Sequence, residues 1–509
     1  MLAKINGFGL QGIEGYEVQL EIDINNGMPG IEIVGLADTA VKESKERVRS
    51  AIKNSGFKLP PKKITVNLAP ASVKKEGSIY DLGIAIGMLY ATEQISCPLV
   101  ADYIFVGELS LDGRLRHING LMPLLIAAQA NGFKKIIVPT ANAKEAAFID
   151  GVDVFAFETL NEVVDFLEGR TVVSPVEKCE VLFNIGTKYK EDFKYVRGQY
   201  VAKRALEIAA AGGHNVLMVG PPGAGKTMLA KCIPSILPDF TVQEALETTK
   251  IHSVAGVLNE NDGLVFTRPF RSPHHTVSPI ALTGGGSNAR PGEMSLAHNG
   301  VLFLDELPEY PRSCLEILRQ PLEDGVINIS RAARTVEYPA QFMLVASMNP
   351  CPCGYFGSKT RECTCTPLQI SKYLSKLSGP LMDRIDLHIS VDSVTYDDLT
   401  GDSLAESSEK FRERVNKARR IQLERFMGTG VHCNAKMTAV MLKEFCKTDD
   451  ESERLLRQAF DKLKLSARAY TRILKVARTI ADLAGEENIT IKHISEALNY
   501  RSMDRDYLG

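Results

Sequence analysis

A glycine-rich segment at residues 220–227, GPPGAGKT, constrains the fold of this chain more than any other part of its sequence. It follows the apolar run NVLMV and precedes MLAKCIPSIL, which gives the order strand, loop, helix. In that context the pattern is typical of the phosphate-binding loop of P-loop NTPases, because its glycines let backbone amides turn toward a phosphate at a helix N-terminus. The sequence therefore predicts a parallel α/β sheet that binds a nucleotide where its strands end.

The residues of this loop have distinct expected roles toward ATP and Mg²⁺. Lys226 neutralises charge on the β- and γ-phosphates, and the hydroxyl of Thr227 ligates Mg²⁺. The predicted nucleotide-binding set consists of Gly220, Pro221, Pro222, Gly223, Ala224, Gly225, Lys226, Thr227 and Asp305.

Two later strands are expected to end in the groups that hydrolyse ATP. The run VLFLDE ends in Asp305, placed to hold Mg²⁺ with Thr227, and in Glu306, which can polarise the attacking water. An acidic pair after a strand could also cap a helix, but the phosphate loop favours the catalytic interpretation. The run FMLVASMNP ends in Asn349, which either orients that water or is a turn residue before a proline.

Two arginines are candidates for sensing the γ-phosphate. Arg384, in GPLMDRIDLHI, is predicted to act as an arginine finger on a neighbouring subunit's nucleotide, with a surface salt bridge as the alternative. Arg468, in KLSARAYTRILKVARTI, is predicted to contact the γ-phosphate of its own subunit. Arg472 and Arg478 on the same predicted helix are competing candidates.

Length and charge narrow the class of protein. A chain of 509 residues predicts about three domains. Lys and Arg total 60 against 62 for Asp and Glu, so no global positive charge indicates nucleic acid, and any such contact must be local. The sequence shows no signal peptide and no run of 18 apolar residues, and six of its ten cysteines are scattered singly. We therefore expect a cytoplasmic protein that does not span a membrane.

Changes in periodicity divide the chain into an α/β fold with a helical end. Residues 1–170 alternate short β-branched runs with helical stretches, and residues 171–194 are predicted to be a linker. Residues 195–392 repeat the order apolar strand, glycine turn, helix, which predicts a buried parallel sheet. Residues 393–509 carry helical spacing over 408–427, 438–463, 466–484 and 490–499.

Long motifs in the second half of the chain resemble the AAA+ superfamily, and within it the Mg-chelatase-like ATPases of the ComM/YifB type. This resemblance implies a ring-forming, hexameric ATPase with a helical lid at 393–509. In the ComM branch such a ring is a DNA helicase that drives branch migration in natural transformation and recombination. Beyond the phosphate loop, the matching segments are VRGQYVAKRALEIAAAGGHN at 196–215, RPFRSPHHTVSPIALTGGG at 268–286, RPGEMSLAHNGVLFLDELPE at 290–309, NPCPCG at 349–354 and SGPLMDRIDLHI at 378–389.

Two basic clusters are the predicted contacts to single-stranded and branched DNA. EDGVINISRAARTVEYP predicts two short strands with Arg331 and Arg334 near the tip, where related helicases carry a pore hairpin. Arg268 and Arg271, with His274 and His275, lie in a loop that resembles the helix-2 insertion of the same clade. Both clusters could instead be solvated loops.

The first domain resembles the protease domain of Lon, over VGELSLDGRLRHINGLMPLLIAAQANGFKKIIVP at 106–139. A Lon-type peptidase needs a nucleophilic serine and a lysine base. Ile79 stands at the serine position and Met122 at the lysine position, while Ser78 is one residue out of register. We therefore expect a scaffold or binding module without peptidase activity.

Four cysteines form one cluster. Cys351 and Cys353 are separated by nine residues from Cys363 and Cys365, enough chain to close a tetrahedral zinc site of structural type. A free-thiol loop and a reversible disulfide are the alternatives.

The leading hypothesis from the sequence is an ATP-driven motor on DNA. An ATPase subunit of a metal-chelatase-type remodelling complex is the alternative, and a structural ATP switch is a third possibility. An ATP-dependent protease conflicts with Ile79 and Met122.

Overall fold

The computed structural model describes residues 2–179, 189–258, 262–286, 289–331, 334–358, 361–393, 405–463 and 465–501. The chain forms two compact units. The first comprises Met1–Leu182 and Val242–Phe266, and the second comprises Phe183–Thr241 and Thr267–Gly509. Of the predicted linker, residues 180–188 lie outside the described part, and so do residues 394–404 at the start of the predicted lid.

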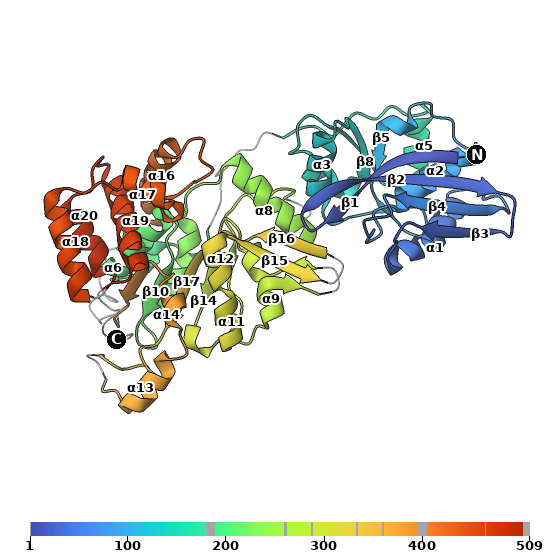
Figure 1. The fold of residues 1–509 in the computed structure, drawn as a ribbon. Coiled ribbons are helices and arrows are strands. Elements are labelled where there is room, and N and C mark those ends of the chain that lie inside the picture. Colours follow the sequence, from blue (N-terminus) through green and yellow to red (C-terminus); the bar gives the residue numbers. More distant parts are fainter. Residues whose placement is uncertain are drawn as a thin grey trace. The chain divides into compact units, whose positions relative to one another are not determined.

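A seven-stranded mixed sheet is the centre of the first unit (Figure 1). In β4 every second side chain is buried, which is the pattern of a strand with one face on a core. The strand order is β3-β4-β2-β1-β5-β8-β9, in which β1 and β4 are antiparallel to β2 and the other pairs are parallel. The strands are β1 (Leu2–Gln11), β2 (Glu14–Asn25), β3 (Gly30–Val34), β4 (Lys63–Ala69), β5 (Tyr103–Phe105), β8 (Lys135–Pro139) and β9 (Asp153–Phe157), with β6 (Glu108–Leu109) and β7 (Leu115–Arg116) as a separate hairpin.

The helices of the first unit include one segment from the middle of the chain. Residues 242–266 were assigned to the ATPase core by sequence, but the structure groups them with the first unit. The Ser253 hydroxyl donates to the buried carboxylate of Glu145, and the Gly120 N–H donates to the Ser253 hydroxyl at 3.0 Å. Burial raises the pKa of Glu145, so Ser253 supplies a hydrogen bond that this carboxylate needs. The helices are α1 (Thr39–Asn54), α2 (Asp81–Ala91), α3 (Leu121–Ala130), α4 (Ala143–Ala146), α5 (Leu160–Leu167) and α8 (Val242–Ala255).

The positions compared with Lon hold side chains with other partners. Met122 is fully buried at the start of α3, and its N–H donates to the Glu145 carboxylate at 2.7 Å. The Ser78 hydroxyl donates to the carboxylate of Glu108, while Ile79 is buried. These contacts give the three side chains packing and hydrogen-bonding roles.

The second unit is built on a five-stranded parallel sheet in the order β11-β14-β17-β10-β18. All residues of β10, β14 and β17 are buried, as expected for a parallel sheet covered on both faces. The sequence prediction of an α/β core is therefore confirmed. The strands are β10 (Val216–Val219), β11 (Phe270–Arg271), β14 (Val301–Leu304), β17 (Met343–Met348) and β18 (Leu387–Ser390).

Short helices surround this sheet, and a β-hairpin follows α12 (Arg319–Asp324). The hairpin pairs β15 (Val326–Arg331) with β16 (Arg334–Pro339) up to the pair Arg331 and Arg334, as the sequence predicted. A smaller pair is formed by β12 (Gly284–Gly285) and β13 (Arg290–Pro291). The helices are α6 (Tyr200–Gly212), α7 (Lys226–Cys232), α9 (Pro279–Thr283), α10 (Glu293–Leu296), α11 (Arg312–Ile317), α12 (Arg319–Asp324), α13 (Pro367–Leu374) and α14 (Gly379–Met382).

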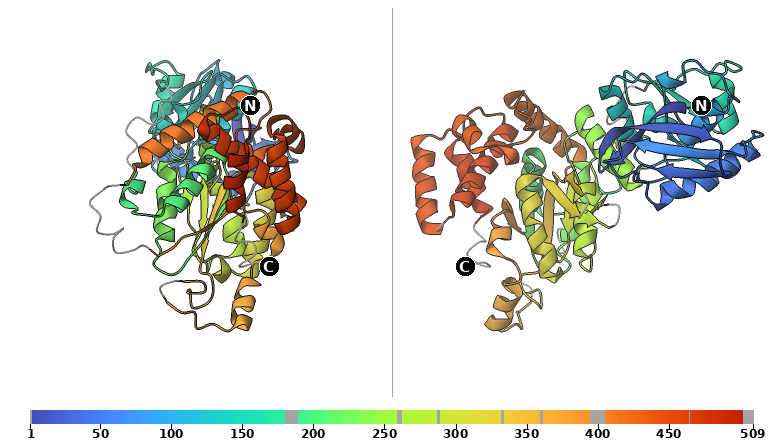
Figure 2. Two further views of the ribbon diagram at one scale, coloured as in Figure 1. Left: turned by 90° about the vertical axis from the view of Figure 1, so that its left-hand side faces the viewer. Right: turned by 45° about the vertical axis from the view of Figure 1, so that its right-hand side comes forward.

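The described C-terminal residues are helical and lie together in the red part of Figure 2. The predicted helical stretch 438–463 is two helices, because residues 446–449 turn and Thr448 forms a bridge with Ile489. None of the helices in the described ranges has the length and apolar character needed to cross a membrane. The helices are α16 (Ser408–Arg425), α17 (Ala439–Phe445), α18 (Asp450–Leu463), α19 (Ala467–Ala484) and α20 (Ile491–Asn499).

Candidate nucleotide site

Three neighbouring strands deliver the predicted nucleotide-binding residues to one edge of the second sheet. Val219, the last residue of β10, is paired with Met348 of β17, and Leu304 of β14 is paired with Ala346. The segments after these strands are the phosphate loop, the acidic pair and Asn349. The sheet register therefore brings together residues that are more than a hundred positions apart in the chain.

Lys226 lies at the centre of this edge, as the first residue of α7. Its ammonium group donates to the Gly220 and Pro221 carbonyls at 2.6 and 2.9 Å, and to Asn349 Oδ1 at 3.1 Å. The residue is only 9% exposed, and burial lowers the pKa of its ammonium against the opposing effect of Asp305 and Glu306. A bound phosphate would replace these two carbonyl acceptors with charged oxygens, which form stronger hydrogen bonds to the ammonium group.

Oxygen ligands suited to Mg²⁺ lie beside the loop. Thr227 Oγ1 donates to Asp305 Oδ2 at 2.7 Å, and the Ser347 hydroxyl donates to the other carboxylate oxygen. A hydroxyl and a carboxylate are hard oxygen donors of the kind Mg²⁺ prefers, so these residues fit the ion. Ser347 was missed by the sequence analysis, although it is the one hydroxyl residue in the apolar run of β17.

The predicted catalytic glutamate is open to solvent. Glu306 has a left-handed backbone, with φ of 53°, and a side chain that is 56% exposed. His275 Nδ1 lies 3.8 Å from Glu306 Oε2, and its ring packs on His274 with the centroids 4.0 Å apart. The sequence pattern predicts His275 as part of a basic DNA-binding loop, whereas the structure places it beside the carboxylate expected to activate water.

The two predicted γ-phosphate sensors share a single acidic partner away from the phosphate loop. Arg384 is buried, donates to the Pro380 carbonyl at 2.7 Å and forms an ion pair with Glu323. Arg468, with a side chain 57% exposed, reaches the other oxygen of Glu323 at 3.5 Å. The structure thus groups Arg468 with Arg384, and it shows no contact of Arg468 with the described phosphate-loop residues.

The competing arginines of α19 have internal partners. Arg472 donates to the Arg384 carbonyl at 2.7 Å and pairs with Asp386. Although burial opposes it, the pKa of Asp386 is lowered, chiefly by the charge of Arg472. Arg478 is buried against Asp482 at 3.0 Å. Arg468 is therefore the accessible arginine of the three.

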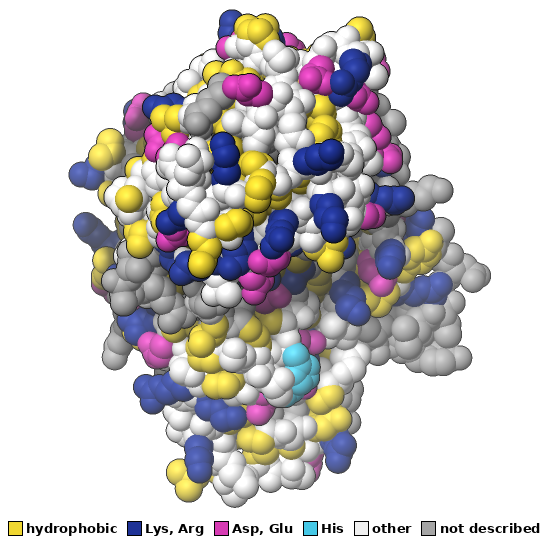
Figure 3. All heavy atoms as spheres, turned by 90° about the vertical axis from the view of Figure 1, so that its right-hand side faces the viewer, with side chains coloured by type: hydrophobic (Ala, Val, Ile, Leu, Met, Phe, Trp, Pro, Cys, Tyr) yellow, Lys and Arg dark blue, Asp and Glu magenta, His cyan; other side chains and the backbone are white. Residues whose placement is uncertain are grey.

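Of the four predicted DNA contacts, two have internal hydrogen-bond partners. Arg268 donates to the carbonyls of Pro238, Asp239 and Asn299, and Arg271 makes two 2.7 Å contacts to the Glu293 carboxylate. A DNA phosphate would have to displace these partners. The side chains of Arg331 and Arg334 lie outside the described part, so only their place at the hairpin end is known. On the face shown in Figure 3, Lys and Arg are interspersed with acidic and apolar side chains, in keeping with a net charge of −2.

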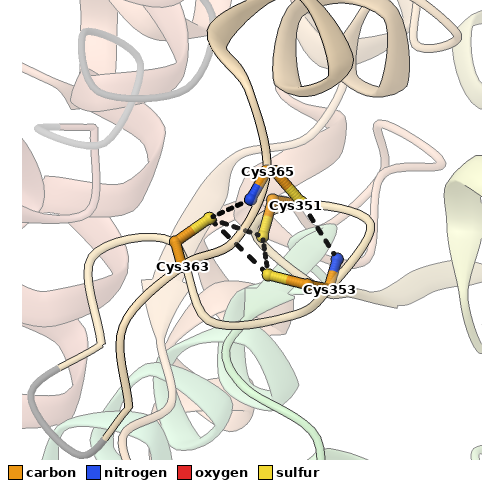
Figure 4. A group of neighbouring side chains, drawn as sticks. All are labelled: Cys351, Cys353, Cys363 and Cys365. Atoms are coloured by element: carbon orange, nitrogen blue, oxygen red, sulfur yellow. Dashed lines mark hydrogen bonds between the residues drawn. The ribbon is translucent and has the colours of Figure 1, made fainter.

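The four clustered cysteines come together after β17. Their sulfur atoms all lie within 4.8 Å of one another, and they form the single candidate metal group of three or more ligands among the residues that the structure describes (Figure 4). All four are free thiols, so the disulfide alternative is not what this structure contains.

Comparison with known proteins gives matches along nearly the whole chain. Three family models match: magnesium chelatase, subunit ChlI, over residues 192–399; subunit ChlI of Mg-chelatase, over 20–142; and the subunit ChlI C-terminal family, over 405–501. The competence protein ComM of Haemophilus influenzae is 46% identical over 510 residues, covering 99% of this chain and 98% of that protein. The YifB protein of Escherichia coli is 44% identical, covering 97% and 96%. Lon protease 2 of Bacillus subtilis is 26% identical over 179 residues, 32% of each chain.

Proposed function

Because the chain belongs to the Mg-chelatase-like AAA+ ATPases of the ComM/YifB type, we propose that it forms a ring that hydrolyses ATP to move branched DNA. ATP hydrolysis is supported by the edge of the second sheet, where Lys226, the Thr227–Asp305 pair and Asn349 meet. The competence protein among its relatives supports the DNA part.

In this proposal the residues of the sheet edge divide the work of hydrolysis. Lys226 would leave the two loop carbonyls and bind the β- and γ-phosphates, while Thr227 and Asp305 would hold Mg²⁺, whose charge would neutralise that of the phosphates. Glu306 orients the attacking water and accepts its proton. Asn349, held by Lys226, is placed to hydrogen-bond the same water.

A second part of the proposal is that Arg384 and Arg468 act across a subunit boundary. Arg384 and Arg468 converge on Glu323, and Arg384 lines a pocket together with Glu316, Arg319, Glu323 and residues 327–330 of the hairpin. We propose that both arginines contact the nucleotide of a neighbouring subunit in a homo-hexamer, which revises the expected role of Arg468 within its own subunit. An arginine supplied in this way stabilises the charge that develops on the transferring phosphoryl group.

The DNA contact is proposed at the end of the β15–β16 hairpin. Arg331 and Arg334 pair with each other in register, so both residues lie at the same end of this hairpin. Guanidinium groups suit phosphate oxygens, and phosphate contacts carry no sequence information. We therefore expect binding to single-stranded and branched DNA that is largely independent of sequence.

The double variant Arg331→Ala/Arg334→Ala tests the DNA proposal. It should weaken binding to unrelated DNA sequences, reduce the salt dependence by up to about two units of slope, and abolish strand displacement on forked and four-way DNA. Basal ATP hydrolysis should persist, since neither residue belongs to the phosphate site. Lys42→Ala/Lys45→Ala, which removes two exposed charges from α1, is the matched control. Wild-type unwinding by the arginine variant would refute the hairpin assignment.

An ATPase subunit of a metal-chelatase-type remodelling complex remains the alternative, supported by the family models that match. The two functions differ in what stimulates ATP hydrolysis. A DNA motor should be stimulated by branched DNA, whereas a chelatase-type subunit should respond only to a porphyrin-binding partner protein. For a DNA motor, the proposed location is the cytoplasm.

A further inference from the structure

The geometry of the four-cysteine group fits one tetrahedral metal ion. Cys351 Sγ lies 3.3 Å from Cys353 Sγ and 3.6 Å from Cys363 Sγ, and the last two sulfurs are also 3.6 Å apart. Four thiolates about 2.3 Å from a zinc ion have sulfur separations of about 3.8 Å, close to these values. A disulfide would require about 2.05 Å between two sulfurs. In Figure 4 the four side chains point toward one another from two segments of the loop.

Backbone amides stabilise the sulfur atoms as hydrogen-bond acceptors. The Phe356 N–H donates to Cys351 Sγ at 3.3 Å, the Cys365 N–H donates to Cys363 Sγ at 3.4 Å, and the Cys353 N–H donates to Cys365 Sγ at 3.4 Å. Such hydrogen bonds around the ligands favour thiolates and fix their orientation. With four sulfur ligands, no coordination position is left for a substrate, which is typical of a structural site.

The loop that carries these cysteines contacts the phosphate loop. Gly354 has φ of +86°, and a Cβ at this position would lie 2.5 Å from Pro222 Cδ. The backbone of the cysteine loop therefore rests directly on Pro222, a residue of GPPGAGKT. The carbonyl of Cys351 accepts a hydrogen bond from the Gly354 N–H at 3.0 Å, and Cys351 is fully buried.

The same loop also begins next to Asn349. Cys351 follows Asn349 by two residues, and α13 follows Cys365 directly. A metal ion that joins the two cysteine pairs would close this loop. It would thereby restrain the segment that follows Asn349, the residue that accepts a hydrogen bond from Lys226.

We propose that the four cysteines bind one Zn²⁺ and that this ion keeps Asn349 and Pro222 in position, so that ATP hydrolysis depends on zinc although zinc does no chemistry. The proposal rests on the ATPase function inferred above, but not on the DNA function. The four thiols bind as thiolates and release their protons to water as the ion enters.

The first measurement is the metal content of the full chain purified under reducing conditions. We expect about one zinc per chain. Cys363→Ser/Cys365→Ser should contain none, and Cys179→Ser, which changes an exposed thiol of the first unit, should retain it. Absence of zinc from the reduced wild-type protein, or iron in its place, would overturn the assignment.

The second measurement tests the link to the nucleotide site, with basal ATP hydrolysis measured without DNA. Cys363→Ser/Cys365→Ser should lose about tenfold or more in kcat, the effect typical of disturbing a shell around a functional site. Gly354→Ala should retain zinc but also lose turnover, because the new Cβ displaces Pro222. Normal turnover in a zinc-free cysteine variant would refute the link.

A reversible experiment separates loss of zinc from misfolding. A zinc-selective chelator in excess Mg²⁺ should remove the ion from the wild-type protein and reduce turnover, and added zinc with a thiol reductant should restore it. Binding of a fluorescent ATP analogue by Glu306→Gln before and after chelation gives a readout that needs no hydrolysis. If the wild-type protein never hydrolyses ATP, the function proposed above fails, while a zinc-dependent change in analogue affinity would still support the link. Unchanged affinity and turnover after complete zinc removal would overturn it.

Discussion

Two regions of the molecule differ in how many of their expected functional contacts one chain supplies. They are the phosphate loop with its neighbouring strand ends, and the arginine pair on Glu323. At the strand ends, Lys226 donates to Asn349 and Thr227 donates to Asp305, so these side chains are already brought together. At the arginine pair, Arg384 and Arg468 are held by the carboxylate of Glu323. The first region is assembled by a single chain, whereas the second holds two arginines on an internal carboxylate.

The difference has a physical cause. A buried guanidinium without a counter-charge is costly, so Arg384 needs Glu323 as long as no phosphate is present. In the proposed transfer to a neighbouring nucleotide, Arg384 would exchange one anionic partner for another, so its charge would not be left unpaired. Glu323 is half exposed and can be solvated after the arginine leaves.

The largest effects should come from breaking the strand-end region. Lys226→Ala removes the cation that meets the phosphates and should weaken ATP binding by about a hundredfold or more. Glu306→Gln should retain binding but lose hydrolysis by up to about ten-thousandfold, since only activation of water is removed. Nucleotide-binding and turnover assays should separate the two variants, with Lys231→Ala on the same helix as the control. Near-normal turnover by Glu306→Gln would exclude that residue from the catalytic role.

Arg384→Ala should have a comparable effect on turnover with a different signature. We expect a loss on the order of a thousandfold in kcat with nearly normal ATP affinity, because an arginine from a neighbour acts on the transition state. Arg319→Ala, which changes a guanidinium of the same pocket, is the control. Mixed rings of Arg384→Ala and Lys226→Ala subunits should regain activity at interfaces where the intact halves meet. No recovery in rings proven to be mixed would indicate a structural role within the chain.

The smallest effect is expected from Glu323→Gln, which tests whether the carboxylate of Glu323 restrains the two arginines. Without the carboxylate, Arg384 and Arg468 leave their internal partner more easily, and turnover should rise by about two- to fivefold, the equivalent of a weak ion pair. Glu316→Gln removes a carboxylate of the same pocket that pairs with Arg319 and should have no such effect. A strong loss of ATPase activity in Glu323→Gln would mean that the carboxylate positions Arg384 for catalysis.

Much of the strand-end region could be predicted because its residues are tied to local patterns. The glycines and Lys226 lie within eight consecutive residues, and Asp305, Glu306 and Asn349 each follow an apolar run. In a parallel sheet the carboxyl ends of such runs meet at one edge, so their proximity follows from the pattern itself. Ser347 was missed because a hydroxyl inside a strand can face either side of the sheet until its register is known.

The remaining contacts join segments that share no local pattern. Nothing near His275 indicates that its ring lies beside Glu306, and Arg268 and Arg271 have the composition of a DNA-binding loop although their donors are occupied within the chain. The grouping of α8 with the first unit includes hydrogen bonds of Ser253 to Glu145 and Gly120, residues more than a hundred positions away in the chain.

The family, the parallel sheet and the residues proposed to bind ATP could be inferred from the sequence alone, because periodic burial and a phosphate loop are encoded over short stretches of chain. Which distant residues contact one another could be read only from the folded structure. It assigned Glu323 to both arginines, His275 to Glu306, and Gly354 to Pro222. Such pairings depend on which distant side chains satisfy one another once water is excluded, and a linear sequence does not specify that before the chain has folded.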